Sequence, residues 1–240
     1  MEVHHHTDLH HKKKHLKEYF AEFLMIFLAV TLGFLAENLR ENIVENHNEK
    51  VYARSLTSDF TTDTATLHEL IDFTKDKISN IDSLETHLHH TGNRVSDSTL
   101  YACLLNLIST FQYDNVNGTY EQIKSSGALK LFDQSLVNNL NGCDATASKL
   151  KLMEDWENKF LYEKVNPQTQ LMFNYKVFND LRARTSIAHK MYLNNMSADF
   201  IDLLVNQSEL VKRLRERQLD QQKILLDKAN TILIDLKKEY

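Results

Sequence analysis

Glycine and proline are the residues that this sequence has least of. It contains 5 glycines and 1 proline among 240 residues, whereas an average protein devotes roughly 12 % of its residues to these two types. β-Sandwiches and β-barrels need a tight turn about every 8–12 residues, and doubly wound nucleotide-binding folds need Gly-rich loops. The scarcity excludes these classes, together with collagen-like and proline-rich chains. It predicts an all-α protein built from long helices.

A large excess of charge of one sign is also lacking. Lysine and arginine number 28 against 33 aspartates and glutamates, which gives a net charge of −5, and 42 % of the residues are apolar. This balance argues against disorder and against a general affinity for nucleic acid. We therefore expect a folded protein without a nucleic-acid partner.

Familiar catalytic motifs are missing as well. The sequence holds no P-loop, no HExxH helix, no GxSxG elbow and no recognisable Ser/His/Asp order. Its carboxylates are scattered over helical faces, where they are normally solvated. The sequence therefore predicts a protein that is not an enzyme. The remaining enzymatic alternative, an unrecognised hydrolase, needs a cleft with paired titratable groups.

One hydrophobic run stands out at residues 19–36, which read YFAEFLMIFLAVTLGFLA and carry a single charge, Glu22. As an α-helix this run spans about 27 Å, close to the roughly 30 Å of a bilayer's hydrocarbon core. The alternatives are a buried core helix of a soluble protein and a cleaved signal peptide. Cleavage before Glu37 would place the bulky Phe34 where a small residue is needed. We therefore predict an uncleaved transmembrane helix whose partner is the lipid bilayer.

Charged residues flank this run unequally. Lysines precede it and acidic residues dominate after it: Lys12, Lys13, Lys14 and Lys17 lie before the run, whereas Glu37, Glu41, Glu45 and Glu49 outnumber Arg40 and Lys50 behind it. Basic flanks stay on the cytoplasmic side of a membrane. This predicts a cytoplasmic His/Lys-rich tail at 1–18, a transmembrane helix at 19–36, and the rest of the chain in the periplasm or outside the cell.

Two small residues lie four positions apart within the run. Ala29 and Gly33 form a small-xxx-small pair, a spacing that lets two helix backbones approach closely in lipid. Alanine and glycine are also common in membrane helices without any such role. The pair is therefore a candidate site of transmembrane helix association, with incidental small residues as the alternative.

Residues 37–90 contain no strong helix breaker. Apolar residues recur there at helical spacing, through Val44, Val51, Leu56, Phe60, Leu67, Leu70, Ile71, Ile78, Ile81, Leu84 and Leu88. This predicts that the membrane helix continues outward as a stalk helix over 37–90. The threonine-rich run TSDFTTDTAT competes for backbone hydrogen bonds, so a kink or break is expected near residues 57–64.

The remaining residues, 91–240, predict an antiparallel helical bundle that packs with the stalk. The first helix is expected to start at Ser96 or Asp97, and the second at the capping-box pattern of Thr119 and Gln122. A third helix is expected over 134–164, with a possible break at Asn141-Gly142. The fourth starts at an N-cap at Asn166 and carries Leu171, Tyr175, Phe178 and Leu181 on its apolar face, and the last runs from Ser197 almost to Tyr240. In the last helix Leu203, Leu214, Leu225 and Leu236 recur every 11 residues, with Leu210, Gln221 and Ile232 on a parallel track. That period suits a nearly straight bundle helix.

Three segments together carry a family resemblance: MEVHHH at the N-terminus, KKKHLKEYFAEFLMIFLAVTLGFLAENLRE at 12–41, and TYEQIKSSGALKLF at 119–132. With these segments the chain resembles a family of uncharacterised single-span proteins of Gram-negative bacteria, classed as a domain of unknown function. The resemblance covers nearly the whole chain in layout and is most specific at 17–41 and 119–132. It implies an inner-membrane location with a periplasmic helical domain, and it transfers no catalytic residue.

The second motif has five matching positions, namely Tyr120, Lys124, Ser125, Ser126 and Gly127. A structural explanation exists for them: a cap, an apolar contact and a glycine that ends a helix in the left-handed conformation. We favour this explanation over a ligand site.

Histidines gather in the N-terminal tail, at His4, His5, His6, His10, His11 and His15. Imidazoles bind divalent transition metals well, but the tract lacks the defined ligand spacing of a rigid metal site. We expect at most weak metal binding there and no resident cofactor. His87 and His90, one helical turn apart, are a second group, for which a solvated helix end is the preferred interpretation.

Two cysteines, Cys103 and Cys143, lie in the part predicted to be exported. In an oxidising compartment they can form a disulfide that closes a loop of about 40 residues and contributes roughly 3–4 kcal/mol. The alternative is two buried thiols. The basic run Lys212, Arg213, Arg215 and Arg217 lies among acidic residues and is interpreted as a mixed-charge solvated face.

These observations favour a non-enzymatic, membrane-anchored scaffold or accessory subunit of an envelope complex. Its expected partners are other envelope or membrane proteins, or a second copy of the chain. The alternative is a periplasmic sensor or small-ligand-binding module that signals through a membrane partner, because the predicted cytoplasmic tail is too short to fold. A polar pocket between the helices would favour the sensor, and a solidly packed interior would favour the scaffold.

Overall fold

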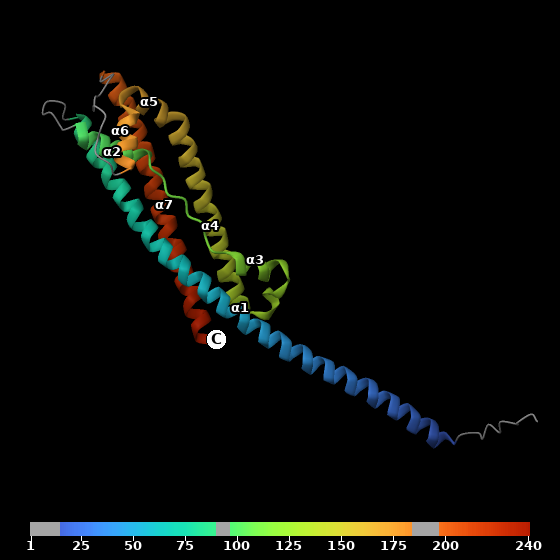
Figure 1. Ribbon diagram of the computed structural model, residues 1–240. Coiled ribbons are helices and arrows are strands. Elements are labelled where there is room, and N and C mark those ends of the chain that lie inside the picture. Colours follow the sequence, from blue (N-terminus) through green and yellow to red (C-terminus); the bar gives the residue numbers. More distant parts are fainter. Residues whose placement is uncertain (1–14, 90–96, 184–196) are drawn as a thin grey trace, which may run out of the picture. The chain divides into compact units, whose positions relative to one another are not determined.

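The computed structural model describes residues 15–89, 97–183 and 197–240 (Figure 1). Within these ranges the chain is helical and holds no β-sheet, which confirms the all-α prediction. The elements are α1 (Leu16–His89), α2 (Asp97–Ile108), α3 (Gly118–Ser125), the 3₁₀ helix η1 (Ala128–Leu131), α4 (Gln134–Phe160), the π-helical turn η2 (Leu161–Val165), α5 (Asn166–Met172), α6 (Tyr175–Arg182) and α7 (Ala198–Glu239). They form two compact units, residues 1–51 and 52–240.

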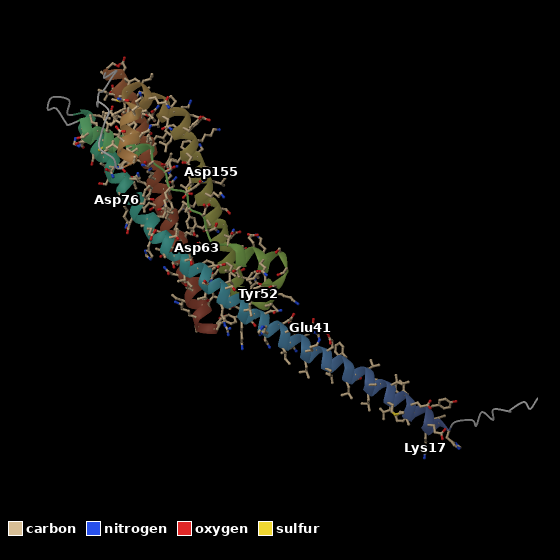
Figure 2. All side chains as sticks on the ribbon, in the orientation of Figure 1. Lys17, Glu41, Tyr52, Asp63, Asp76 and Asp155 are labelled. Atoms are coloured by element: carbon tan, nitrogen blue, oxygen red, sulfur yellow. The ribbon has the colours of Figure 1, made fainter. Side chains whose placement is uncertain are left out.

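The first unit is the part of α1 that ends at Val51. An 18-residue window of this helix has a mean hydropathy of 2.0, and none of the window is buried. Figure 2 shows its side chains projecting from the helix between the labelled Lys17 and Glu41. By length and composition this helix can span a membrane, and it is the one such helix in the described ranges. The predicted stalk segment 37–90 is divided between the two units, because the boundary falls after Val51 and the greater part of the segment belongs to the second unit.

The second unit is organised by a seven-residue repeat in three long helices. Buried residues recur at alternating steps of three and four: Ala53, Leu56, Phe60, Asp63, Leu67, Leu70, Thr74, Lys77, Ile81, Leu84 and Leu88 in α1; Leu136, Leu140, Cys143, Ala147, Leu150, Glu154 and Glu157 in α4; and Leu204, Ser208, Val211, Arg215, Gln218, Gln222, Leu225, Ala229, Ile232 and Leu236 in α7. This spacing is the heptad pattern of helices that pack knobs into holes.

The predicted 11-residue repeat of the last helix is therefore wrong as a description of its buried face. Leu225 and Leu236 are each 1 % exposed, but Leu203 is 43 % and Leu210 is 39 % exposed. An 11-residue step equals one heptad plus four residues, so it stays on the buried stripe for one step and then drifts off it. The buried positions in the middle of α7 hold polar residues. A count of leucines alone therefore skips these positions and gives the longer period.

Long-range hydrogen bonds give the directions of the three helices. The Ser208 hydroxyl donates to Glu85 Oε1 at 3.0 Å and Gln222 Nε2 donates to Thr74 Oγ1 at 3.0 Å, so α7 runs antiparallel to this part of α1. Between α4 and α7, Asn139 Nδ2 donates to Asp235 Oδ2 at 3.1 Å and Arg215 Nε donates to Glu157 Oε1 at 2.7 Å. α4 is thus also antiparallel to α7, and it runs in the same direction as α1 (Figure 1).

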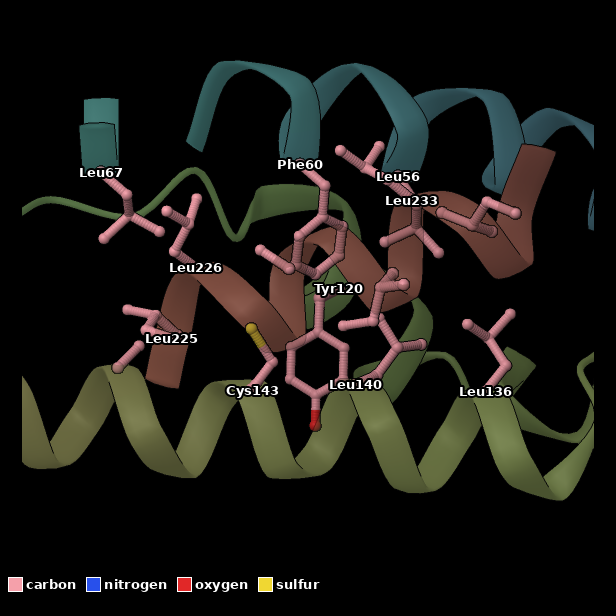
Figure 3. Close-up of a cluster of buried hydrophobic side chains, with 14 of the residues drawn as sticks. Leu56, Phe60, Leu67, Tyr120, Leu136, Leu140, Cys143, Leu225, Leu226 and Leu233 are labelled. Atoms are coloured by element: carbon pink, nitrogen blue, oxygen red, sulfur yellow. The ribbon is translucent and has the colours of Figure 1, made fainter. Parts of the chain in front are cut away.

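Two hydrophobic clusters fill the interior of this unit. The first cluster is centred on Leu56, Phe60, Leu140 and Leu225, and Figure 3 shows its side chains from α1, α4 and α7 pointing toward one another. The second cluster contains Leu84, Tyr101, Leu161, Phe178 and Leu204. Along each of the three long helices, buried polar residues lie between the two clusters.

The expected break near residues 57–64 is wrong, because α1 is continuous there. The threonine hydroxyls turn back onto the helix instead of competing with it: Thr57 donates to the Ala53 carbonyl at 2.8 Å and Thr61 to the Thr57 carbonyl at 2.6 Å. Such i−4 bonds are tolerated within a helix. Likewise α4 passes through Asn141 and Gly142 without interruption.

Two predicted helix starts and one predicted continuous helix also need correction. Thr119 is not an N-cap: α3 starts at Gly118, and the Thr119 amide donates to Asp59 Oδ2 of α1 at 3.3 Å. Asn166 is not a cap either, since it has helical φ and ψ of −56° and −44° and follows the π-helical turn directly. The segment beyond it forms two helices rather than one, because Phe173 is extended and the Asn174 side chain caps α6.

Candidate functional site

Seven buried polar residues lie between the two clusters, and we call them the polar layer. They are Thr74 and Lys77 of α1, Glu154 and Glu157 of α4, and Arg215, Gln218 and Gln222 of α7, all 6 % exposed or less. Each occupies a position of the heptad stripe, so helix register rather than hydrophobicity places it inside. A buried polar layer is costly unless its groups bond one another, and the geometry supplies many of these bonds.

Arg215 and Glu157 form the central ion pair of the layer. The Nε of Arg215 donates to Glu157 Oε1 at 2.7 Å, and Gln218 Nε2 donates to Glu157 Oε2 at 2.8 Å. The Nη2 group of Arg215 donates to the carbonyls of Leu107 at 2.8 Å and Ser109 at 3.2 Å. The arginine thereby joins α7 to α4 and to the end of α2. The interpretation of Arg215 as part of a solvated face is wrong, since this residue is 3 % exposed.

Glu154 holds the extended segment that links α2 to α3, residues 109–117. Its Oε2 accepts a hydrogen bond from the Tyr113 amide at 3.1 Å. The pKa of Glu154 is raised to about 7, mainly by burial and also by the negative charges of Glu157, Asp155 and Asp114, while the Tyr113 amide opposes the shift. Glu154 is therefore a carboxyl group that changes its protonation near neutral pH.

Other carboxylates hold the same segment along its length. The Val116 amide donates to Asp63 Oδ1 at 2.8 Å, and Gln112 Nε2 donates to Asp155 Oδ1 at 3.4 Å. Burial raises the pKa of Asp63, although the Val116 amide opposes the shift. An extended backbone has no hydrogen bonds of its own, so these helix carboxylates supply the acceptors that its buried amides need.

Lys77 brings a second positive charge to the layer. Its Nζ donates to Asn106 Oδ1 of α2 at 3.0 Å and lies 4.7 Å from the centre of the Phe73 ring. The pKa of Lys77 is lowered to about 8, mainly by burial and also by the nearby Arg215, while Glu157 and Asp76 oppose the shift. Strongly shifted pKa values in one place are typical of functional sites, although structural ion networks produce them too.

A small cavity lies within the polar layer. It gives about 20 Å³ of room to the centre of a water-sized molecule and is lined by all seven layer residues together with Ser109, Thr110 and Phe111. Three buried atoms of its lining residues have no hydrogen-bond partner: Arg215 Nη1, Glu154 Oε1 and Gln222 Oε1. The cavity therefore combines unused donors and acceptors with space for a molecule as small as water.

A second cavity, of about 30 Å³ by the same measure, lies beside Asp63, Tyr113, Tyr120 and Cys143. Burial raises the pKa of the Tyr113 phenol, and the Asp63 charge adds to the shift. Both cavities have room for water and not for an organic metabolite. What the site can do chemically is hold charge, bind a small ion or water, and exchange a proton at Glu154.

The predicted metal ligands His4, His5, His6, His10 and His11 lie outside the described residues. His90 of the second histidine group lies outside them too. Within the described ranges, no group of three or more His, Cys, Asp or Glu residues is placed to hold a metal ion. Weak metal binding by the tail stays a prediction.

Ala29 and Gly33 lie on an uncovered face of the apolar helix. A Cβ atom added to Gly33 would meet no atom within 4 Å beyond its neighbours in the chain and the backbone of its own helix. The face is thus open to lipid or to another helix, and association through it stays a prediction.

The possible disulfide between Cys103 and Cys143 is not formed in this structure. Both thiols are free and buried, with Cys103 in the second cluster and Cys143 in the first. Burial raises the pKa of the Cys103 thiol and raises that of Cys143 to about 12, so neither is a reactive thiolate at neutral pH. The alternative of two buried thiols describes the structure.

The second family motif has a structural explanation at each position. Tyr120 is buried and its hydroxyl donates to Asn141 Oδ1 at 2.7 Å. Lys124 lies 3.6 Å from Asp144 of α4, and the hydroxyls of Ser125 and Ser126 donate to backbone carbonyls one turn earlier. Gly127 has a φ of +73°, the left-handed conformation that ends the helix as predicted.

Sequence reasoning missed the polar layer. The signal was present: the steps of three and four in α1 run on through Thr74 and Lys77 without interruption. Charged residues on helices were interpreted as solvent-exposed, so the buried positions Thr74 and Lys77 were not recognised as part of the stripe.

Comparison of the chain with protein-family models, with curated proteins and with solved structures finds no match. The resemblance to the family of single-span inner-membrane proteins therefore stays a prediction.

Proposed function

We propose that this protein is a non-enzymatic, membrane-anchored scaffold or accessory subunit of an envelope protein complex. In this proposal α1 anchors it in the bacterial inner membrane, the N-terminus lies in the cytoplasm, and the helical bundle acts in the periplasm. One observation carries the proposal: an apolar helix long enough to span a membrane belongs to a chain whose bundle has a packed heptad interior with water-sized cavities. Such an interior favours action through the outer surface.

An exposed apolar stripe on α4 supports action through a surface. Leu152 is 70 % exposed, and Trp156, the one tryptophan of the chain, is 48 % exposed. The indole stacks on Phe160 with 5.6 Å between ring centres and an angle of 3°. Tryptophan is enriched among the residues that dominate the binding energy of protein interfaces.

The test is crosslinking and affinity isolation of the full chain from native membranes, followed by mass spectrometry. We expect a defined partner or a second copy, and we expect the double variant Leu152→Ser/Trp156→Ser to lose it. Tyr162→Ser, which changes a residue that is 76 % exposed, is the matched control and keeps the partner. A strictly monomeric protein in mild detergent, with no specific crosslink, would contradict the proposal.

The orientation has its own test. Protease added to spheroplasts should digest the bundle from outside and leave residues 1–36 protected. Digestion only after the membrane is opened would overturn the periplasmic assignment.

A sensor is the second candidate, because the polar layer holds two groups whose pKa values lie near neutrality. Given the size of the cavity in the polar layer, a signal sensed there would be protons or a small ion rather than a metabolite. A partner captured equally at pH 6 and pH 8.5 would favour the plain scaffold.

A further inference from the structure

The charges of the polar layer balance when the Glu154 carboxyl is ionised but not when it is protonated. Lys77 and Arg215 are cationic, and Glu157 is the anion paired with the arginine. Below a pH of about 8, where Lys77 keeps its proton, the layer is neutral when Glu154 is ionised, and one positive charge remains without compensation when Glu154 carries a proton. An uncompensated charge in a buried layer is costly, so the protonated state calls for an additional anion.

The layer also has an unused cationic donor at its cavity. Of the three nitrogens of Arg215, Nε and Nη2 donate to Glu157 and to two backbone carbonyls, whereas Nη1 has no partner. This side chain is 97 % buried, at 3 % exposure, and lines the cavity. Glu154 Oε1 also lacks a partner, and in the neutral acid this oxygen can carry the proton and donate.

We propose that the cavity of the polar layer binds one small monovalent anion of the size of chloride, held by Arg215 Nη1 and by the protonated carboxyl of Glu154. The positive charge of Lys77, at the same cavity, adds to the attraction. Because one positive charge remains uncompensated when Glu154 carries its proton, a monovalent anion neutralises the layer, whereas the doubly charged sulfate would leave it negative. A divalent cation is repelled by Arg215 and Lys77.

Anion binding and proton binding are then coupled. Glu154 faces Asp155 and Glu157 on its own helix, Tyr113 and Asp114 on the 109–117 segment, Arg215 on α7 and Lys77 on α1. Its folded-state pKa lies at about 7, above the ordinary 4.5, so the proton is present at pH 6 and largely gone at pH 8.5. The anion therefore binds at pH 6, is released at pH 8.5, and by linkage raises the pKa of Glu154 while it is bound.

The experiment measures thermal unfolding of the full chain in detergent by circular dichroism at 222 nm. Sodium chloride is compared with sodium gluconate at equal ionic strength, at pH 6 and at pH 8.5. We expect the midpoint in 150 mM chloride to lie about 3 °C above that in gluconate at pH 6 and less than about 1 °C above it at pH 8.5. Bromide should replace chloride, and its anomalous scattering in a crystal grown at pH 6 should place it beside Arg215.

Three variants separate this site from a general salt effect. Glu154→Gln imitates the neutral acid and keeps a donor, so its chloride response should persist at pH 7.5, where Lys77 still carries its proton and the natural chain has lost most of its response. Arg215→Lys keeps the charge but removes Nη1, so its response should vanish at both pH values. Arg213→Lys, at an exposed position on the same helix, is the matched control and should respond as the natural chain does.

If Arg215→Lys does not fold, Glu154→Gln and the bromide position still decide the question. The proposal is overturned by equal midpoints in chloride and gluconate at pH 6, by a chloride response in the natural chain that is the same at both pH values, or by water alone in the cavity of the bromide crystal.

Discussion

The polar layer and the first hydrophobic cluster are built on the same heptad positions of the same three helices. In the cluster these positions hold residues such as Leu67, Leu140 and Leu225, and in the layer they hold Lys77, Glu157 and Arg215. Burial is therefore decided by the register of the helices, and the chemistry at each level differs. Burying a leucine stabilises the folded state at any of these positions, whereas burying Arg215 is favourable only because Glu157 lies opposite it.

This difference gives the two regions different roles. Leucine contacts are non-directional, so the cluster stabilises the bundle without fixing how far one helix slides along another. The bond from Arg215 Nε to Glu157 and that from Gln222 to Thr74 are lost if α7 shifts by one turn. We infer that the layer selects the axial register of α7 and that the clusters supply the stability, as buried polar residues do in coiled coils.

The largest effect is expected from Glu157→Ala, which removes the anion of the polar layer. It leaves the buried Arg215 guanidinium without its anion and should lower the free energy of unfolding by about 3–5 kcal/mol. Urea denaturation of the full chain in detergent, followed by circular dichroism, measures the loss. A loss below about 1 kcal/mol would mean that water already solvates the layer.

The corresponding change in the cluster is Leu225→Ala. This leucine is 1 % exposed, and its truncation should cost about 3 kcal/mol through lost burial and the cavity left behind. Leu152→Ala on the exposed face of α4 is the control and should cost less than about 0.5 kcal/mol. Similar losses at both leucines would contradict the assigned interior.

How far the sequence predicts this fold depends on the same contrast. The all-α class, the membrane-length helix and the left-handed Gly127 were predictable because each rests on local chemistry: few breakers, one apolar run, one glycine after a helix. The broken helix at 57–64 was predicted wrongly because local propensity was weighed without the packing that holds Ala53, Phe60 and Leu67 in one stripe.

The candidate site was much less predictable. Arg215 is surrounded in sequence by Arg213, Glu216 and Arg217, which are exposed, and nothing local distinguishes it from them. Its anion, Glu157, lies 58 positions away, and the pairing exists only once α4 and α7 are packed. A heptad count would have marked the position as buried, but it would not have identified the partner.

Glu154→Gln tests how the stability of the polar layer depends on pH. A carboxyl group whose folded-state pKa is raised stabilises the fold fully below its ordinary pKa of 4.5 and loses that contribution as the pH rises through about 7. The amide never ionises, so the variant should be about 1–2 kcal/mol more stable than the natural chain at pH 8. At pH 5 the Glu154 carboxyl of the folded natural chain still carries its proton, so the two proteins should be nearly equal in stability. Urea midpoints at the two pH values measure this. A natural chain that gains stability from this site between pH 5 and 8 would contradict the raised pKa.

The smallest expected effect comes from an ion pair at the edge of the same interface. Lys212 of α7 pairs with Asp82 of α1, whose side chain is 55 % exposed, so water already solvates much of the pair. Lys212→Gln should therefore cost about 0.5 kcal/mol or less, and the cost should disappear in high salt, in contrast to the salt-insensitive loss at Glu157. Urea denaturation of Lys212→Gln and Glu157→Ala at low and high salt compares them directly. A loss at Lys212 as large as that at Glu157 would mean that helix register is set by charge at the rim rather than by the buried layer.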